Sequence, residues 1–204
     1  MGQGQRRDGP AGRVSGNEQG GATQRLFVAV PLPTESLEFV AAAQRLLPPI
    51  SGLRLMREEQ LHVTLAFIGE VGERKAAAAR QVVESVVSGL GGEGVIERFL
   101  MLPSPNRARV VALEVSDSDR VFATLFEEVM TGLERAEVMQ REKRPFRPHL
   151  TIARLRDAGV VQPRSESGRA RYAVESVCLF ESELRREGAV YTVRARTPLA
   201  CKEQ

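Results

Sequence analysis

Residues 61–68 read Leu-His-Val-Thr-Leu-Ala-Phe-Ile, and this stretch predicts a β-strand. Large apolar side chains recur with a period of two, as expected for a strand that is buried on one face. The apolar face would carry Leu61, Val63, Leu65 and Phe67. The opposite face would present an imidazole and a hydroxyl group, from His62 and Thr64, on a rigid element.

The same four-residue pattern returns at 149–152, which read His-Leu-Thr-Ile. His62 and His149 are the two histidines of the chain, and each stands two residues before a threonine. In an extended strand the two polar side chains of each pattern emerge on one face, about 6.6 Å apart. A single strand histidine is most often a satisfied surface or core residue. Threonine occupies only 8 of 204 positions, so chance explains the repetition poorly and a functional pair is favoured.

The rest of the chain alternates between strands in adjacent pairs and helices with an apolar stripe. Strands are predicted at 26–30, 61–68, 95–102, 108–115, 149–154, 173–181 and 189–196. Helices are predicted at 35–47, 73–90 and 118–138, the second of them ended by Gly91, Gly92 and Gly94. A polar surface loop is expected at 157–170. Adjacent strand pairs are typical of an α+β fold and not of a doubly wound parallel sheet.

Composition limits the class of protein. The 204 residues are 42% hydrophobic and 27% charged, which excludes collagen-like and wholly disordered chains. Residues 1–23 hold seven glycines and few apolar side chains, so we expect a disordered leader followed by a single domain at 24–200. No apolar run approaches the roughly 20 residues of a membrane span, and no secretory signal is evident. These features lead us to expect a cytoplasmic monomer that does not bind membranes.

Charge and cysteine content narrow the partners and cofactors. Lysine and arginine number 29 against 26 acidic residues, and the net charge of +3 permits a nucleic-acid partner without requiring one. Four of the seven residues at 141–147 are basic. The two cysteines, Cys178 and Cys201, form no C-x-x-C pattern, and no cluster of metal-ligand residues is evident. Neither a metal nor another cofactor is therefore expected.

Two facing imidazoles can perform paired acid–base catalysis. A neutral imidazole can take a proton from water, while an imidazolium can protonate a leaving oxygen, and both groups titrate near neutral pH. The hydroxyl groups of Thr64 and Thr151 can donate hydrogen bonds to phosphate oxygens as charge builds there. A phosphodiester is the natural substrate, because its cleavage needs both a base and an acid.

These residues resemble a known family. The two His-x-Thr-x motifs lie 87 residues apart, flanked by Arg-Leu-Phe-Val-Ala-Val at 25–30 and Arg-Pro-Phe-Arg-Pro at 144–148. Together they resemble the two-histidine phosphoesterase superfamily, and within it the RNA 2′,3′-cyclic phosphodiesterases, also called 2′-5′ RNA ligases. The resemblance covers about residues 25–200.

The resemblance implies a bilobal, pseudo-twofold α+β fold, in which each lobe is an antiparallel sheet backed by helices and the active-site cleft lies between the lobes. It implies hydrolysis of RNA 2′,3′-cyclic phosphate ends, including those of tRNA fragments, to 2′-phosphomonoesters. Reversible 2′-5′ ligation would be the same chemistry run backwards. The family's proton donor falls on His62 and its proton acceptor on His149. Its threonines fall on Thr64 and Thr151, and a family arginine falls on Arg154.

Four further residues are candidates for substrate binding. Strand alternation places Arg154 on the face of the strand opposite to that of His149. Arg154 therefore reaches the cleft only if the strand ends or bulges near Ala153. Arg144 and Arg147 could steer or clamp RNA phosphates, although a solvated loop is the better explanation for either one. Phe27 could stack on the terminal base, although a strand phenylalanine is more often part of the core.

Other functions stay open at this point. The same fold could act on another substrate, such as ADP-ribose 1″,2″-cyclic phosphate or a 2′-5′ linked oligonucleotide. It could also serve as a non-catalytic RNA-binding module, although both motifs are intact. A metallohydrolase is disfavoured, because the chain lacks H-E-x-x-H or neighbouring histidines with carboxylates.

Overall fold

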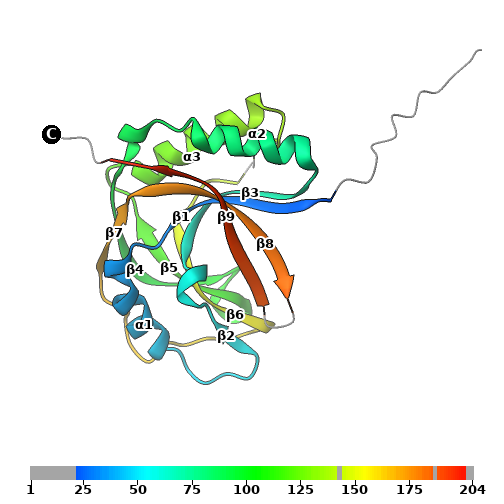
Figure 1. Ribbon diagram of the computed structural model, residues 1–204. Helices are drawn as coiled ribbons and strands as arrows, with labels where there is room; N and C mark the ends of the chain where they lie inside the picture. The colour runs from blue at the N-terminus through cyan, green and yellow to red at the C-terminus, as the bar shows by residue number, and fades with distance from the viewer. Residues whose placement is uncertain (1–21, 142–143, 186–187, 201–204) are drawn as a thin grey trace, which may run out of the picture.

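A curled antiparallel sheet forms the body of the protein, with helices packed against it (Figure 1). The computed structural model describes residues 22–141, 144–185 and 188–200. The strands are β1 (Gln24–Pro31), β2 (Leu53–Leu55), β3 (His62–Val71), β4 (Gly92–Leu102), β5 (Ala108–Ser116), β6 (His149–Gly159), β7 (Ala170–Val174), β8 (Ser176–Arg185) and β9 (Gly188–Pro198). The α-helices are α1 (Leu37–Arg45), α2 (Glu73–Glu84) and α3 (Val121–Arg135). Short 3-10 turns are η1 (Thr34–Ser36), η2 (Glu58–Gln60), η3 (Ser88–Leu90) and η4 (Pro105–Arg107).

The sheet divides at its centre into two sets of four strands. The strands follow one another in space as β7-β4-β5-β6-β3-β1-β8-β9, with β2 paired to β6. We call β3-β1-β8-β9 the first half and β6-β5-β4-β7 the second half. Within the described residues a single register pair, Val63 opposite Leu150, joins the two halves. The expected α+β class is confirmed. The halves form one continuous sheet, so the separate lobes that the resemblance implies remain a prediction.

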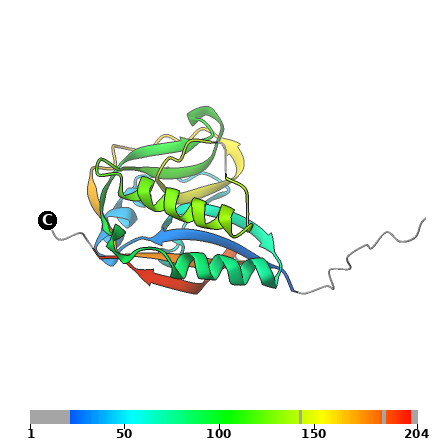
Figure 2. The same cartoon turned by 90° about the horizontal axis from the view of Figure 1, so that it is seen from above.

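Helices α2 and α3 lie side by side over one face of the sheet (Figure 2). α2 packs on β1, β8 and β9, whereas α3 packs on β3 and β4. The two helices approach closely at Gly132, where a Cβ atom would lie 2.6 Å from the Val82 side chain. Leu125 and Val129 of α3 are fully buried, and each contributes roughly 1.5–3 kcal/mol by leaving water. The opposite face of β3 and β6 stays available for a site.

The structure differs from the sequence-based expectations in five places. The strand predicted at 173–181 is broken after Val174, so that β7 pairs with β4 and β8 pairs with β1. The helix predicted at 73–90 ends at Glu84, and Gly92 and Gly94 belong to β4 instead of ending a helix. Glycine is required at 94 because a Cβ atom there would lie 2.8 Å from the Phe122 ring. Strand β2 was not predicted, and β6 continues through Gly159 into the expected loop. Of the expected leader, only residues 22–23 are described, and they precede β1.

Candidate active site

The two histidine motifs meet at the junction of the sheet. Val63 and Leu150 lie opposite one another and are fully buried in the core beneath α2 and α3. Because side chains alternate across a strand, the residues on either side of this pair point to the other face. The structure therefore brings the four motif residues onto one surface, where all are partly buried: His62, Thr64, His149 and Thr151.

A β-bulge follows each motif and redirects the side chain after it. The register of β3 against β1 skips Leu65, and the register of β6 against β5 skips Ile152. Because an extra residue reverses the alternation beyond it, Phe67 and Arg154 return to the face of the histidines. The expectation that Phe67 lies on the buried face was therefore wrong, since 53% of its surface is exposed. Arg154 reaches the site because β6 bulges next to Ala153, as the sequence pattern required for this residue to face the cleft.

A pocket of about 350 Å³ lies against the first motif. Its walls come from the strands of the first half and from one arginine of the second half. The lining residues are Arg25, Phe27, His62, Thr64, Phe67, Arg154, Ser182, Leu184, Ala189 and Tyr191. This pocket places a histidine, a threonine and a cation around one space large enough for a nucleoside.

His62 lies against an aromatic wall. Its ring centroid is 4.9 Å from that of Phe27, 5.5 Å from that of Tyr191 and 6.0 Å from that of Phe180. Burial lowers the pKa of His62 to about 4, and a hydrogen bond to the Gln60 backbone carbonyl opposes this shift. The nearby Arg154 and His149 lower the pKa slightly further. At neutral pH the His62 imidazole is therefore uncharged in the protein alone.

The buried side chain of Gln60 ties this region together. Its amide nitrogen donates to the Ala189 carbonyl at 2.6 Å, and its oxygen accepts from the Arg57 backbone N–H at 3.0 Å. Because the Gln60 carbonyl accepts from the His62 ring, one residue links the imidazole to the β8–β9 hairpin. Gln60 therefore helps to hold the ring in position.

His149 is held by the backbone. Its Nδ1 atom lies 2.8 Å from the Arg147 carbonyl oxygen, which can only accept a hydrogen bond. Nδ1 therefore carries the proton in the neutral ring, and Nε2 is left with a lone pair for the site. Both imidazoles thus use a backbone carbonyl to set their orientation.

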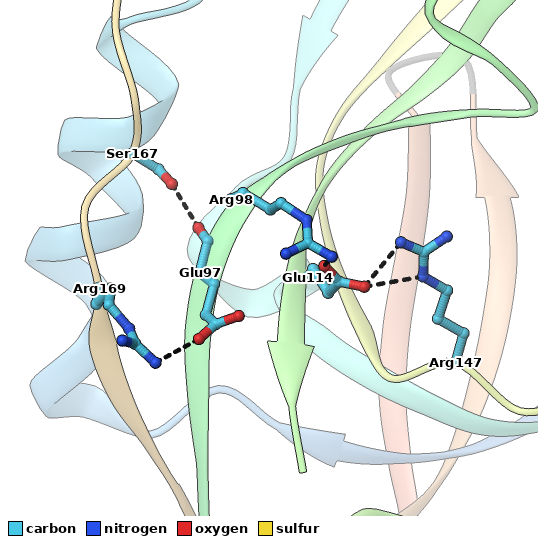
Figure 3. Close-up of polar contacts among 6 residues, drawn as sticks. All are labelled: Glu97, Arg98, Glu114, Arg147, Ser167 and Arg169. Atoms are coloured by element: carbon cyan, nitrogen blue, oxygen red, sulfur yellow. Dashed lines mark hydrogen bonds and ion pairs between the residues drawn. The ribbon is translucent and has the colours of Figure 1, made fainter. Parts of the chain in front are cut away.

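A carboxylate, Glu114, pairs with two arginines, Arg98 and Arg147 (Figure 3). Glu114 of β5 lies opposite His149 in the strand register. Its Oε1 accepts from Nε and Nη2 of Arg147 at 3.0 and 2.7 Å, and its Oε2 pairs with Arg98 at 2.5 Å. Only 14% of the Glu114 side chain is exposed, whereas both arginines are well exposed. This group, which we call the Glu114 cluster, holds two cations at the edge of the site with a net charge of +1.

A larger hollow, of about 650 Å³, lies between β4 and residues 163–169. There Ser167 donates to the Glu97 carbonyl, and the Glu97 carboxylate pairs with Arg169 (Figure 3). No histidine occurs among the described residues that line this hollow. We therefore assign the site to the smaller pocket, despite its lower volume.

The remaining candidates have different surroundings. Phe27 is only 3% exposed, because it packs under His62 with Phe180 and Tyr191, and this differs from the open stacking platform expected from the sequence. Arg147 belongs to the Glu114 cluster, and Arg144 is exposed on the preceding loop. Within the described residues, no group of three or more histidine, cysteine or acidic side chains could hold a metal ion. No described helix could span a membrane.

Sequence reasoning missed several residues of the site: Gln60, Phe67, Arg98, Glu114 and Tyr191. One signal was present for Phe67. Each threonine of the motifs is followed by two apolar residues in succession, Leu-Ala and Ile-Ala, which breaks the period of two. Such a break is what a β-bulge produces. Glu114 and Tyr191 reach the two histidines through pairing of strands far apart in the sequence, β5 with β6 and the β8–β9 hairpin with β1. Arg98 follows Glu114 across the β4–β5 hairpin, and Gln60 lies just before His62 but bonds to the distant Ala189.

Comparison with known proteins decides the family. Residues 32–184 match the family model of the 2′-5′ RNA ligase superfamily. The chain belongs to the 2′-5′ RNA ligase superfamily. The expected family is therefore confirmed, and its curated members support the expected class of enzyme.

Several relatives carry the name RNA 2′,3′-cyclic phosphodiesterase. The protein from Escherichia coli K12 is 33% identical over 182 residues, covering 86% of this chain and 97% of its own length. The protein from Archaeoglobus fulgidus is 30% identical over 175 residues, covering 82% and 96%. Among solved structures, a Thermus thermophilus protein superposes with a TM-score of 0.72 at 27% identity, covering 88% of this chain and all of its own. E. coli LigT gives a TM-score of 0.71 in a complex with 3′-AMP at 28% identity, covering 87% and 99%.

Proposed function

We propose that this protein hydrolyses 2′,3′-cyclic phosphate ends of RNA, including tRNA fragments, to 2′-phosphomonoesters without a metal. The observation that carries the proposal is the meeting of both His-x-Thr motifs on one surface, with Arg154 beside them. The names of the relatives supply the substrate class. Run in reverse, the same chemistry would give 2′-5′ ligation. The protein would act as a cytoplasmic monomer.

The two imidazoles take opposite roles in one displacement. His149 Nε2 takes a proton from water, and the water oxygen forms a bond to phosphorus. The bond from phosphorus to the 3′ oxygen breaks, and that oxygen takes a proton from His62, which leaves the phosphate on the 2′ oxygen. Thr64, Thr151 and Arg154 stabilise the charge that develops on the non-bridging oxygens. Proton exchange with solvent then restores both rings.

The proton-donor role of His62 requires that substrate binding changes its charge. In the protein alone its pKa of about 4 keeps the ring neutral at pH 7. A bound phosphodiester brings a negative charge next to the ring, which favours the imidazolium. We therefore propose that His62 gains its proton together with the substrate, so that the acid is formed only when it is needed.

RNA beyond the terminal nucleotide would follow the second half of the sheet. Arg147 and Arg98 are both exposed and are held at the edge of the site by Glu114. Guanidinium groups in this position suit phosphate oxygens, and Arg144 lies on the loop before them. Phe27 would act indirectly, by supporting His62 from below.

The test is a cleavage assay on a short RNA that ends in a 2′,3′-cyclic phosphate, with EDTA present and the 2′- and 3′-phosphate products resolved. Wild type and a Ser167→Ala control, which lies outside the site, should release the 2′-phosphate. His62→Ala and His149→Ala should not, while circular dichroism shows that they are folded. Loss of wild-type activity on EDTA addition, release of the 3′-phosphate, or near wild-type rates in either histidine variant would overturn the mechanism.

A further inference from the structure

An exposed aromatic ring forms the outer rim of the pocket. Phe67 is one of the large apolar side chains most open to solvent, although it stands in the middle of β3. The guanidinium carbon of Arg25 lies 5.2 Å from the centroid of the ring, and Leu184 of β8 faces the same space. The Phe67–Arg25 contact is a cation–π arrangement that holds the ring in place while much of it remains exposed. An exposed apolar surface inside a pocket indicates a ligand that covers it.

The backbone of β3 determines the position of Phe67. Phe67 lies five residues after His62, just as Arg154 lies five residues after His149, and each is turned toward the site by the same kind of bulge. Both side chains line the same pocket. Arg154 is suited to the phosphate because of its charge. Phe67 offers the complementary surface, so it faces an apolar part of the same ligand.

The side chains that line the pocket indicate which part of the ligand contacts Phe67. A cyclic phosphate at the histidines leaves the base as the flat, apolar-faced group that extends from the ribose. No amide or carboxylate side chain occurs among the described residues that line the pocket, and its neutral polar side chains are the hydroxyl groups of Thr64, Ser182 and Tyr191. The pocket therefore lacks the side chains that usually read adenine and cytosine edges, while Arg25 lies over the Phe67 ring and Arg154 is assigned to the phosphate. The Phe67 ring can, however, stack on any base, because every base has a π-face.

Building on the proposed function, we propose that Phe67 and Arg25 form the subsite for the terminal nucleobase of the substrate, and that this subsite accepts all four bases by stacking. This subsite differs from the stacking role expected of Phe27, whose ring is covered within the aromatic wall. It also assigns opposite tasks to the two positions that follow the bulges: Arg154 contacts the phosphate and Phe67 contacts the base.

The test compares two RNA substrates with the same cyclic phosphate end, one with a normal terminal base and one with an abasic terminal ribose. Wild type should prefer the normal substrate by roughly 10- to 100-fold in kcat/KM, which is the range expected for one stacked base. Phe67→Ala should abolish this preference through KM and leave the abasic substrate unchanged. Phe67→Tyr should keep the preference. Val87→Ala, which truncates an exposed apolar side chain away from the pocket, should behave as wild type.

Three outcomes would overturn the subsite: no wild-type preference, an equal loss on both substrates in Phe67→Ala, or a difference of more than about tenfold among the four bases. Binding provides an independent measurement. Adenosine 2′-phosphate should bind wild type more tightly than ribose 2′-phosphate, and Phe67→Ala should bind both alike. Absence of turnover on either substrate by wild type would contradict the proposed function alone, because the binding comparison still decides the subsite.

Discussion

The two halves of the sheet use one backbone device in two different environments. Each half supplies a histidine, a threonine two residues later, a bulge, and an exposed side chain beyond it. In the first half the histidine lies against aromatic rings, and burial lowers its pKa to about 4. In the second half the histidine lies beside the Glu114 cluster, with its Nδ1 held by a backbone carbonyl. Similar geometry therefore need not give similar chemistry, because the two rings have different neighbouring side chains.

The largest expected effect tests whether the halves act in one step. His62→Ala and His149→Ala should each lower kcat by roughly 10²- to 10⁴-fold, the usual contribution of general acid–base groups. Because the two rings serve the same displacement, the double variant should be little slower than the slower single variant. The measurement is the complete double-mutant cycle on one substrate. Losses that multiply would show that the two rings act independently.

The second prediction concerns the charge of His62. Its pKa is about 4 in the folded protein and about 6.5 when unfolded, so the unfolded chain binds the extra proton between these values. Stability is therefore highest above pH 6.5 and falls as the pH drops toward 4. Between pH 7 and pH 4, His62 should account for about 3 kcal/mol of the fall in the free energy of unfolding, because its pKa shift is about 2.5 units. His62→Gln should lack this part of the fall. Denaturant unfolding of wild type and variant at pH 7 and pH 4 gives the difference.

Two further experiments sharpen this second prediction. NMR titration of wild type should give a His62 pKa near 4, and saturating adenosine 2′-phosphate should raise it. Tyr191→Ala opens the aromatic wall to water, so the pKa should move toward 6.5 in the free protein. An unchanged pKa on ligand binding would count against the proposed proton-donor role of His62.

The smallest expected effect lies in the Glu114 cluster. Its two arginines are exposed, so their ion pairs should contribute only about 0–1 kcal/mol to stability. Arg147→Ala and Arg98→Ala should raise KM a few-fold for an RNA of several nucleotides. Each should also reduce the slope of log binding constant against log salt concentration by about one. A cyclic mononucleotide should be turned over as by wild type. Arg109→Ala, an exposed arginine outside the cluster, is the matched control. Equal effects on both substrates would place the two arginines at the reacting phosphate instead.

Local pattern was enough to predict most of the fold. The strand at 61–68 and the helix at 118–138 have clear periods, and both occur close to the predicted bounds. The motif residues could be found because the same pattern occurs twice. Phe67 was misplaced because strict alternation does not allow for an unpaired Leu65. Glu114 reaches His149 through the pair β5–β6, and Tyr191 reaches His62 because the β8–β9 hairpin pairs with β1. No single stretch of sequence encodes these long-range pairs.

The two bulges also separate positions where a substitution disturbs the core from positions where it does not. Leu65 and Ile152 keep their side chains in the core, and the alternation shift that they introduce sends the next outward position into solvent. Substitutions at 67 and 154 therefore touch little of the core and leave the histidines where they are. Variation at position 67 would tune the choice of terminal base while stability stays nearly constant, so this position suits a designed library. A change at position 154 would instead slow the chemical step, because Arg154 is proposed to contact the reacting phosphate.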